Sequence, residues 1–484
     1  MKLYNTRTRT VEPFAPLREG EVRIYVCGLT PSAQAHLGHA RSFLFFDVLR
    51  RYLAHLGYRV TFVQNVTDID DRSIHAARQT GEDYHAIIER HYAEFKAAMR
   101  KLGVLEYDFE PYATAYVPEI QAMIAELVGA GHAYVSKDGI YYRVASFPSY
   151  GKLSNRNVAD LEAGARIEID EEKEDPLDFA LWKFAKPAEP KWAFEPYGDG
   201  RPGWHIECSA MARALLDPTG QGFDIHGGGA DLIFPHHENE IAQSEPLMRR
   251  PPMANFWVHG GLLLFDSKKM SKSLGNYEPL TDMLERFDPQ AIRLSMLQTS
   301  YGKVKNFTDE SVAGAAAALQ TLKKAYRALR ADASPVTTDL RATGYIQRVE
   351  GELDEDMNTA AALAVMLEFA AQAARIAQRA GAGETLYEYA YVLTLLGIEP
   401  NDAWLTEPHV ALPDDFLQRL GGALDERFDG VGAEGAIERV IAMRQAARAR
   451  KDWAASDRLR DALLNCGVAL TDTKEGTTWS VAAE

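Results

Sequence analysis

Cysteine is scarce in this sequence. Only Cys27, Cys208 and Cys466 occur among 484 residues, which is too few for a disulfide scaffold and typical of a reducing compartment. The stretch from Met1 to Thr10 is polar and lacks the apolar core of a secretory signal. Because no uninterrupted apolar run of about 18 residues occurs, we expect no membrane-spanning helix. These absences argue against a secreted or membrane-embedded protein and favour a cytoplasmic one.

A surplus of positive charge is also missing. The chain has 69 acidic and 53 basic residues and a net charge of −16. Nucleic acids are polyanions that bind basic surface, so the net charge alone argues against a nucleic-acid partner. Residues 444–460 are nevertheless locally basic. On composition alone, the favoured interpretation of this stretch is a solvated helix face.

Two well-known phosphate-binding strings are absent as well. The sequence has neither a GxxxxGK[ST] loop nor a GxGxxG turn, which excludes a P-loop and a dinucleotide fingerprint. Residues 34–40, between a predicted strand and a predicted helix, contain His36, Gly38 and His39. The start of a helix offers free backbone N–H groups to an anion, and both imidazoles can donate to phosphate. Taken alone, the pair also fits two surface histidines at a helix cap.

A second candidate for phosphate binding is the basic stretch 268–275, which contains Lys269 and Lys272. Ammonium groups on a loop can stabilise charge that develops on phosphates during a reaction. Gly228 and Gly229 are further candidates, because glycine lets the backbone approach a nucleotide closely. In isolation, the plainer interpretation of the lysines is an exposed basic turn.

Periodicity near the N-terminus predicts an α/β fold. Residues 22–26 and 59–63 are β-branched runs typical of buried strands. Between them, apolar residues recur at helical spacing. A strand, a helix and a second strand in this order predict a parallel, Rossmann-like sheet. The apolar helix face consists of Phe43, Phe46, Leu49, Leu53 and Leu56.

Later segments predict an insertion and then helical domains. A hairpin turn at Asp138-Gly139 indicates a connective segment inserted in the α/β domain. From about residue 289 the apolar spacing is helical, and the proline-containing stretch 399–414 is typical of a linker. We therefore predict an α/β catalytic domain followed by mainly α-helical C-terminal domains. The predicted limits are 1–110 and 200–275 for the catalytic domain, 111–199 for the insertion, 276–338 for a connecting region, 339–414 for a helical bundle and 415–484 for a small terminal module.

Four side chains suited to zinc are spread along the chain. Cys27 follows the first predicted strand, and Cys208 ends the string Gly-Trp-His-Ile-Glu-Cys. If a helix begins just before His236, that residue and Glu240 share one face, and His237 points elsewhere. Two thiolates, one imidazole and one carboxylate make a plausible four-ligand zinc set. Spacing alone leaves His237 open as a ligand, and both cysteines also fit small buried residues.

The phosphate-binding candidates together resemble the two signatures of class I aminoacyl-tRNA synthetases. Residues 36–39 read HLGH, like the family's HIGH element, and residues 269–273 read KMSKS, its second signature. Their order, with an insertion between them, is also that of the family. The resemblance implies an ATP site with Mg²⁺, in which His36, His39, Lys269 and Lys272 are catalytic and Gly38, Gly228 and Gly229 help bind the nucleotide.

The cysteine-specific branch of that family is the most similar. The likeness covers essentially the whole chain, in GRPGWHIECSAM (200–211), DIHGGGADLIFPHHENEIAQS (224–244), KMSKSLGN (269–276), LDEDMNTAAAL (353–363) and ARARKDWAASDRLRD (447–461). It implies one zinc ion per chain, held by Cys27, Cys208, His236 and Glu240. It also implies a cysteine pocket shaped by Gly28, Thr67, Trp204 and Asp231, although Thr67 and Trp204 equally fit core positions.

The activity implied by this resemblance is ATP-dependent conversion of L-cysteine to cysteinyl-adenylate and its transfer to the 3′ end of tRNA(Cys). Zinc prefers sulfur to a neutral hydroxyl oxygen, so the metal would select cysteine over serine without an editing domain. Residues 276–338 would contact the tRNA stem, and 415–484 would bind the anticodon. We expect a cytoplasmic monomer with no membrane partner. The expected anticodon contacts, which also fit surface charges around a core tryptophan, are Arg448, Trp453, Asp457, Arg460 and Asp472.

Two other functions compete with this one. A related ligase joins cysteine to an amino-sugar in mycothiol synthesis, but that family lacks a complete terminal module, and residues 430–479 look intact here. A non-catalytic paralogue that binds tRNA or senses cysteine is the other alternative, against which the complete signatures argue. Residues 29–35 and 299–302 depart from the family's usual pattern, which leaves their contacts open.

Overall fold

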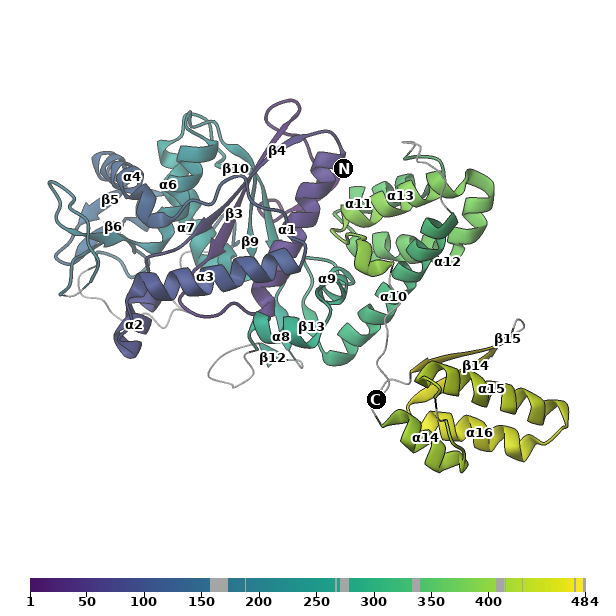
Figure 1. Ribbon diagram of the computed structural model, residues 1–484. Helices are drawn as coiled ribbons and strands as arrows, with labels where there is room; N and C mark the ends of the chain where they lie inside the picture. The colour runs from purple at the N-terminus through teal and green to yellow at the C-terminus, as the bar shows by residue number, and fades with distance from the viewer. Residues whose placement is uncertain are drawn as a thin grey trace. The chain divides into compact units, whose positions relative to one another are not determined.

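The computed structural model contains two compact units, Met1–Trp404 and Leu405–Glu484, each described here by itself (Figure 1). At the N-terminus, β1 (Lys2–Asn5) and β2 (Thr10–Pro13) pair as an antiparallel ribbon. The residues that the structure describes are 1–156, 173–187, 189–265, 268–269, 278–332, 340–405, 413, 415–428, 430–473 and 476–481.

A four-stranded parallel sheet organises the larger unit. Helix α1 (Leu37–His55) packs on one face of this sheet and α6 (Trp204–Leu216) on the other (Figure 1). This arrangement confirms the predicted Rossmann-like fold. The strands lie in the order β10 (Ala254–Gly260), β9 (Phe223–Gly229), β3 (Glu21–Leu29) and β4 (Arg59–Val66).

Strand alternation decides which side chains of β3 meet which helix. Ile24 and Val26 belong to the core beneath α1, whereas Tyr25 and Cys27 belong to the core beneath α6. Successive side chains of a strand point to opposite faces, so this division follows from the sequence. Cys27 therefore faces the helix that carries Cys208.

The predicted apolar face of α1 is correct except at its end. Phe43, Phe46, Leu49 and Leu53 are buried, but Leu56 is 38% exposed. The helix ends at His55, and Leu56 caps it by donating its N–H to backbone carbonyls of the last turn. The helical pattern therefore continued one residue beyond the helix itself.

Helices and then a second sheet follow β4, and the predicted insertion, 111–199, covers only part of them. Helices α2 (Asp71–Thr80), α3 (Tyr84–Lys101) and α4 (Val117–Gly129) come first, with η1 (Ala113–Tyr116) before α4. The hairpin predicted at Asp138-Gly139 is confirmed, because Tyr134 pairs with Tyr141. The antiparallel sheet consists of β5 (Ala133–Val135), β6 (Gly139–Tyr142), β7 (Phe179–Phe184) and β8 (Gly200–Pro202), and η2 is Val144–Ser146.

A small sheet follows the catalytic core. Its strands are β12 (Lys268–Lys269), β11 (Leu263–Phe265) and β13 (Lys305–Phe307), in that order. Two expectations are wrong here: the start of the basic stretch is a strand rather than a loop, and the region after residue 289 is not wholly helical. Both strands are too short for periodicity to identify. Two short helices, α8 (Leu280–Arg286) and α9 (Pro289–Leu297), lie between them in sequence.

Lys305 supplies a prediction about stability. It is buried, and burial, reinforced by Arg41, lowers the pKa of its ammonium from 10.5 to about 8. Burying the charged ammonium therefore lowers the free energy of unfolding by its full amount below pH 8, and this destabilisation shrinks as the pH rises toward 10.5. We expect Lys305→Met to raise the free energy of unfolding by about 1–2 kcal/mol at pH 7 and by less at pH 9.5. Urea denaturation at both pH values measures this, and the exposed Lys303→Met is the matched control.

Helices complete the larger unit. They are α10 (Asp309–Asp332), α11 (Tyr345–Asp354), α12 (Thr359–Ala380) and α13 (Ala382–Leu395). Among the described residues, α12 alone is long and apolar enough to cross a membrane, but it packs against α10, α11 and α13. The predicted linker is wrong at its start, because η7 (Asp402–Trp404) buries Trp404 against this bundle.

The smaller unit has its own core. It contains α14 (Phe416–Leu424), α15 (Ala433–Ala449) and α16 (Trp453–Asn465), followed by the antiparallel pair β14 (Val468–Thr473) and β15 (Gly476–Val481). Apolar residues of the three helices and of β14 are buried together. The five domain limits drawn from the sequence stay predictions.

Candidate active site and metal centre

The main cleft of the larger unit lies at the carboxyl ends of the parallel strands. It encloses about 280 Å³ and is lined by residues from the ends of β3, β9 and β10 and from the start of α1. In an open α/β sheet this is the edge at which ligands bind. The cleft contains His36, Gly38, His39, Gly28, Trp204, Gly228, Gly229 and Asp231 of the predicted site, together with Ser42 and Arg72, which the sequence analysis missed.

The two signature histidines cap helix α1. His36 Nδ1 accepts the backbone N–H of Gly38 at 3.0 Å, and His39 Nδ1 accepts that of His36 at 3.2 Å. Their rings stack with centroids 3.9 Å apart. Burial lowers the pKa of His36, and burial with the neighbouring His36 lowers that of His39 to about 3. Both rings are therefore neutral at pH 7, and because each Nδ1 accepts a hydrogen bond, each ring carries its proton on Nε2.

Glycine is obligatory where β3 meets β4. A Cβ at Gly28 would lie 1.7 Å from the backbone oxygen of Asn65, so a larger residue would separate the strands. The Asn65 side chain accepts the Gly28 N–H at 2.8 Å and donates to Thr67 Oγ1 at 3.2 Å. Thr67 is buried beside the cleft rather than lining it. The amide thus holds two predicted cysteine-pocket residues in one network.

The four predicted metal ligands converge at this cleft, which Cys27 itself lines. One donor atom from each of Cys27, Cys208, His236 and Glu240 lies within 4.8 Å of the other three, and all four residues are buried. Glu240 Oε1 is 3.3 Å from the sulfur of Cys27 and 3.1 Å from His236 Nε2. The predicted i,i+4 pairing occurs across the junction of η4 (Ile233–His237) and α7 (Glu238–Ser244).

Electrostatics at these four residues favours a cation. Burial raises the pKa of the Cys27 thiol. The hydrogen bond between Cys27 and Cys208 lowers the pKa of the Cys208 thiol to about 6. Although burial opposes both changes, His226 and His236 lower the pKa of Glu240 to about 2, and Glu240 raises that of His236 to about 10. A thiolate and a carboxylate thus share a buried site with one imidazolium. Buried charges of this kind are normally paired or coordinate a metal.

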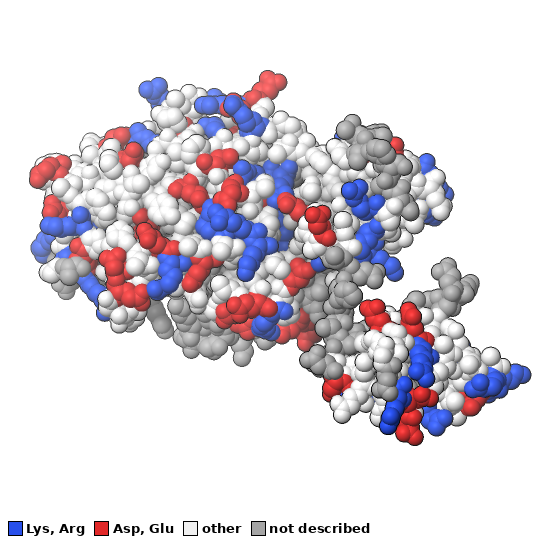
Figure 2. Space-filling view, in the orientation of Figure 1, with Lys and Arg blue, Asp and Glu red and all other residues white. Residues whose placement is uncertain are grey.

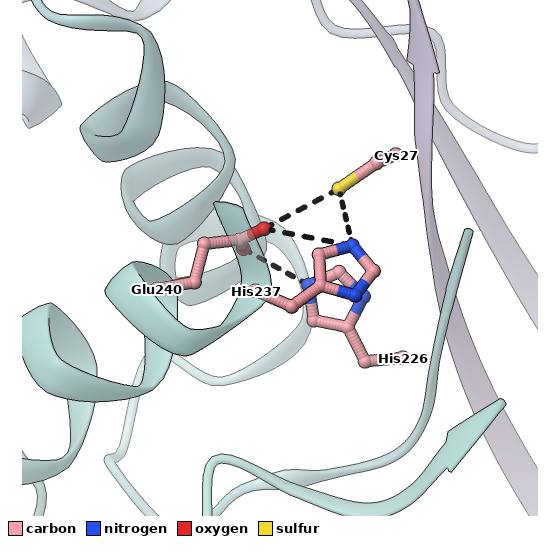
Figure 3. A group of neighbouring side chains, drawn as sticks. All are labelled: Cys27, His226, His237 and Glu240. Atoms are coloured by element: carbon pink, nitrogen blue, oxygen red, sulfur yellow. Dashed lines mark hydrogen bonds and ion pairs between the residues drawn. The ribbon is translucent and has the colours of Figure 1, made fainter. Parts of the chain in front are cut away.

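A second group of donors shares two of these side chains. His226 Nε2 lies 2.9 Å from Glu240 Oε2, and His237 Nε2 lies 3.3 Å from Cys27 Sγ (Figure 3). Their donor atoms also lie within 4.8 Å of one another. The structure thus brings His237 to Cys27, which is the alternative that spacing had left open. His237 Nδ1 in turn lies 2.7 Å from His259, a buried histidine that the sequence analysis did not predict here.

Trp204 and Asp231 stand at the mouth of the cleft. The indole of Trp204 stacks on His236 with centroids 4.3 Å apart, yet 38% of Trp204 is exposed. A core role for Trp204 is thereby excluded, because the residue lines the cleft and more than a third of it is exposed. Asp231, in η3 (Ala230–Leu232), is exposed. Lys269 lies in β12, and Lys272 lies outside the described residues.

The five predicted anticodon contacts all lie in the smaller unit. Trp453, Asp457 and Arg460 are exposed and recur at i, i+4 and i+7 of α16, which puts them on one face. Arg448 of α15 lies 2.8 Å from Asp472 of β14. The alternative of a core tryptophan is excluded, because Trp453 is 58% exposed.

Arg444 of α15 contacts one of these five residues. Its guanidinium donates two hydrogen bonds of 2.8 Å to the two carboxylate oxygens of Asp472. The hydrogen bond from Arg444, helped by Thr477, lowers the pKa of Asp472. Arg444 precedes Arg448 by one helical turn, and this spacing could have indicated from the sequence that both arginines share one face of α15. On the face drawn in Figure 2, basic and acidic side chains are interspersed, so a net charge of −16 leaves room for local basic groups.

Comparisons with known proteins decide the family. The family described as tRNA synthetases class I (C) catalytic domain matches residues 13–317, and the cysteinyl-tRNA ligase anticodon binding domain matches residues 432–479. Cysteine–tRNA ligase of Methylococcus capsulatus is 45% identical over 99% of both chains, and that of Pseudomonas aeruginosa is 43% identical over 100% of both. The chain belongs to the cysteine–tRNA ligase family. It is accordingly an enzyme, an aminoacyl-tRNA ligase.

Solved structures agree at the level of the fold. Methionyl-tRNA synthetase of Mycobacterium tuberculosis, in complex with methionyl-adenylate, is similar with a TM-score of 0.54 and 16% identity, covering 78% of this chain and 89% of its own. Arginyl-tRNA synthetase of Thermus thermophilus gives 0.52 and 16%, over 81% and 84%. At such identities the likeness shows the class I fold of the family and no finer property.

Proposed function

We propose that this member of the family activates L-cysteine with ATP and transfers it to the 3′ end of tRNA(Cys), with one zinc ion selecting the thiol. A single observation carries the proposal. Four buried donor atoms of two cysteines, a histidine and a glutamate lie within 4.8 Å of one another, and Cys27 among them lines the cleft that holds the HLGH turn. That juxtaposition supports a sulfur-binding centre beside a phosphate-binding one.

The donor set fits zinc. Cys27, Cys208, His236 and Glu240 are the ligand types of tetrahedral zinc sites, and the excess negative charge of their buried group calls for a cation. When bound, zinc supplies a soft Lewis acid that prefers sulfur to a hydroxyl oxygen. Trp204, stacked on His236, orients that imidazole and closes one side of the cysteine pocket. Gly28 and Asp231 complete this pocket, and Thr67 supports it through Asn65, which bonds both Thr67 and Gly28.

Activation needs no side-chain nucleophile. A carboxylate oxygen of cysteine attacks the α-phosphorus of ATP, the bond to the β-phosphate oxygen breaks, and pyrophosphate leaves with its electron pair. His36 and His39 donate Nε2–H to the phosphate oxygens as charge grows on them, because both rings are neutral. Lys269 and Lys272 add positive charge, Mg²⁺ accompanies ATP, and Gly38, Gly228 and Gly229 let the nucleotide approach the backbone.

Transfer then uses the tRNA. The terminal ribose hydroxyl attacks the adenylate carbonyl, AMP leaves, and the hydroxyl proton passes to solvent or to the leaving phosphate. We place anticodon recognition on Arg448, Trp453, Asp457, Arg460 and Asp472, where an exposed indole suits stacking with an unstacked base. The protein would act as a cytoplasmic monomer, in a compartment that keeps Cys27, Cys208 and Cys466 reduced.

One experiment tests the whole proposal. The zinc-loaded protein is expected to catalyse ATP–pyrophosphate exchange with cysteine at least about 10³-fold faster than with serine and to charge tRNA(Cys). Ligation of cysteine to glucosaminyl-inositol, without tRNA charging, would favour the mycothiol ligase instead. Absence of exchange in protein containing one zinc per chain would support a non-catalytic paralogue and overturn the proposal.

A further inference from the structure

Arg41 is a buried cation for which the chemistry above gives no role. It lies on α1 two residues after His39, does not itself line the cleft, and is only 4% exposed. Burial lowers the pKa of its guanidinium to about 10. Among the residues that the structure describes, no carboxylate forms an ion pair with it, although buried arginines usually have such a partner.

Backbone carbonyls take the place of that partner. Arg41 Nη1 donates to the oxygens of Gly261 and Leu262 at 3.1 and 2.5 Å. Arg41 Nη2 donates to the oxygen of Ser300 at 3.3 Å and also to that of Lys303. One planar guanidinium thus ties two loops, 260–262 and 300–303, to the first turns of α1.

The two loops reach Arg41 through backbone contact with each other. Gly261 donates its N–H to the oxygen of Tyr301 at 2.7 Å, and a Cβ at Gly261 would lie 2.4 Å from the oxygen of Lys303. The ring of Tyr301 stacks on Phe45, one turn after Arg41, at 3.9 Å. Arg41 and Phe45 together form the surface of α1 on which the loops rest.

These loops lead directly to the second signature. Leu262 precedes β11, which pairs on one edge with β12 and on the other with β13. Lys269 of KMSKS belongs to β12 and pairs with Leu264. The guanidinium is therefore one hydrogen-bonded connection between the helix that begins with HLGH and the loops that flank the sheet carrying the first lysine of KMSKS. A backbone hydrogen bond from Leu280 to Ala35 is another link between the two signature regions.

We infer that Arg41 is a positioning residue for adenylate formation. It sets the distance between the signature histidines and Lys269, so that both groups reach the same phosphates in the transition state. The inference rests on the proposed function, which assigns Lys269 to those phosphates. Arginine is required because its planar fork carries donors to four carbonyls, whereas the single nitrogen of lysine cannot span both loops.

Arg41→Lys keeps the charge and removes the fork. It is expected to lower kcat for ATP–pyrophosphate exchange by about 10²-fold, since misplacement of a reacting group by about 1 Å has that effect. The KM for cysteine and the zinc content should stay unchanged. Arg50→Lys is the matched control, because Arg50 lies on the same helix and donates to Glu106 and Asp108, away from both signatures.

A double-mutant cycle separates positioning from general stability. If Arg41 acts through Lys269, then Arg41→Lys should lower kcat by less than about threefold in a Lys269→Ala background. A full loss in both backgrounds, or no loss in the wild-type background, overturns the inference. If Lys269→Ala itself exchanges pyrophosphate normally, the proposed function of Lys269 fails instead.

A second variant covers the case in which Arg41→Lys does not fold. Gly261→Ala disturbs the same contact from the acceptor side, because its methyl group meets the carbonyl of Lys303. The same loss of kcat, again absent in the Lys269→Ala background, supports the positioning role of Arg41. Normal exchange by Gly261→Ala and by any folded Arg41 variant contradicts it.

Discussion

Cys208→Ser is expected to remove zinc from the protein and to lower cysteine-dependent ATP–pyrophosphate exchange by roughly 10³-fold. A hydroxyl oxygen is a poor ligand for zinc, and the remaining donors, Cys27, His236 and Glu240, leave the buried carboxylate incompletely neutralised. Metal analysis of the purified protein and the exchange assay with cysteine measure the two effects. Exchange with serine should not improve. The variant loses the selection of sulfur but gains no group that binds a hydroxyl.

The third cysteine provides a matched control. Cys466 is also buried and reduced, but it lies in the smaller unit, at the end of α16. Cys466→Ser should therefore retain both zinc and exchange activity while removing the same atom type from the protein. Zinc retained at one ion per chain in Cys208→Ser would remove that residue from the metal site.

The two donor groups that share Cys27 and Glu240 call for a further comparison. His236→Asn removes a ligand from the group with both cysteines, whereas His226→Asn removes one from the group in Figure 3. We expect zinc loss in the first variant and retention in the second, because two thiolates bind zinc more tightly than one. The opposite pattern would assign the metal to His226 and His237 and leave Cys208 as a buried thiol.

Much of the site could be predicted because its residues stand at ends of regular elements. Cys27 follows a run of buried β residues, and the alternation of β3 requires it to face α6. His36 and His39 sit where a strand has ended and a helix begins, which is readable from periodicity. The HLGH and KMSKS strings, at 36–39 and 269–273, then indicated the resemblance to class I aminoacyl-tRNA synthetases. These are local patterns, which can be identified from the sequence without knowledge of the tertiary fold.

Other features depend on packing between distant segments and left no local trace. His226 and His259 lie on adjacent parallel strands, and only that pairing brings them to His237 and Glu240. The small sheet of β11, β12 and β13 joins strands of two or three residues, which are too short to show a period. Trp404 looked like part of a linker because burial of one side chain is not encoded by its neighbours.

His39→Ala is expected to lower kcat for ATP–pyrophosphate exchange by about 10²- to 10³-fold, with little change in the KM for cysteine. The ring donates only to charge that grows on the phosphates, so its removal affects the transition state more than the bound substrates. Steady-state exchange at varied cysteine and ATP measures this split. His85→Ala, an exposed histidine in the first turn of α3, is the control and should be normal.

The pH dependence distinguishes a neutral donor from a cation at His39. With a pKa of about 3, the ring stays neutral from pH 6 to 8, so the ratio of wild-type to His39→Ala rates should be constant there. An imidazolium with the ordinary pKa near 6.5 would instead make that ratio fall as the pH rises.

Lys272→Ala provides the cationic comparison, and we expect a similar loss of kcat. Near-normal exchange in that variant would discredit the assignment of KMSKS. Because the lysines supply charge and the histidines supply neutral donors, the two losses should respond differently to salt, which screens a cation's long-range attraction far more than a short hydrogen bond.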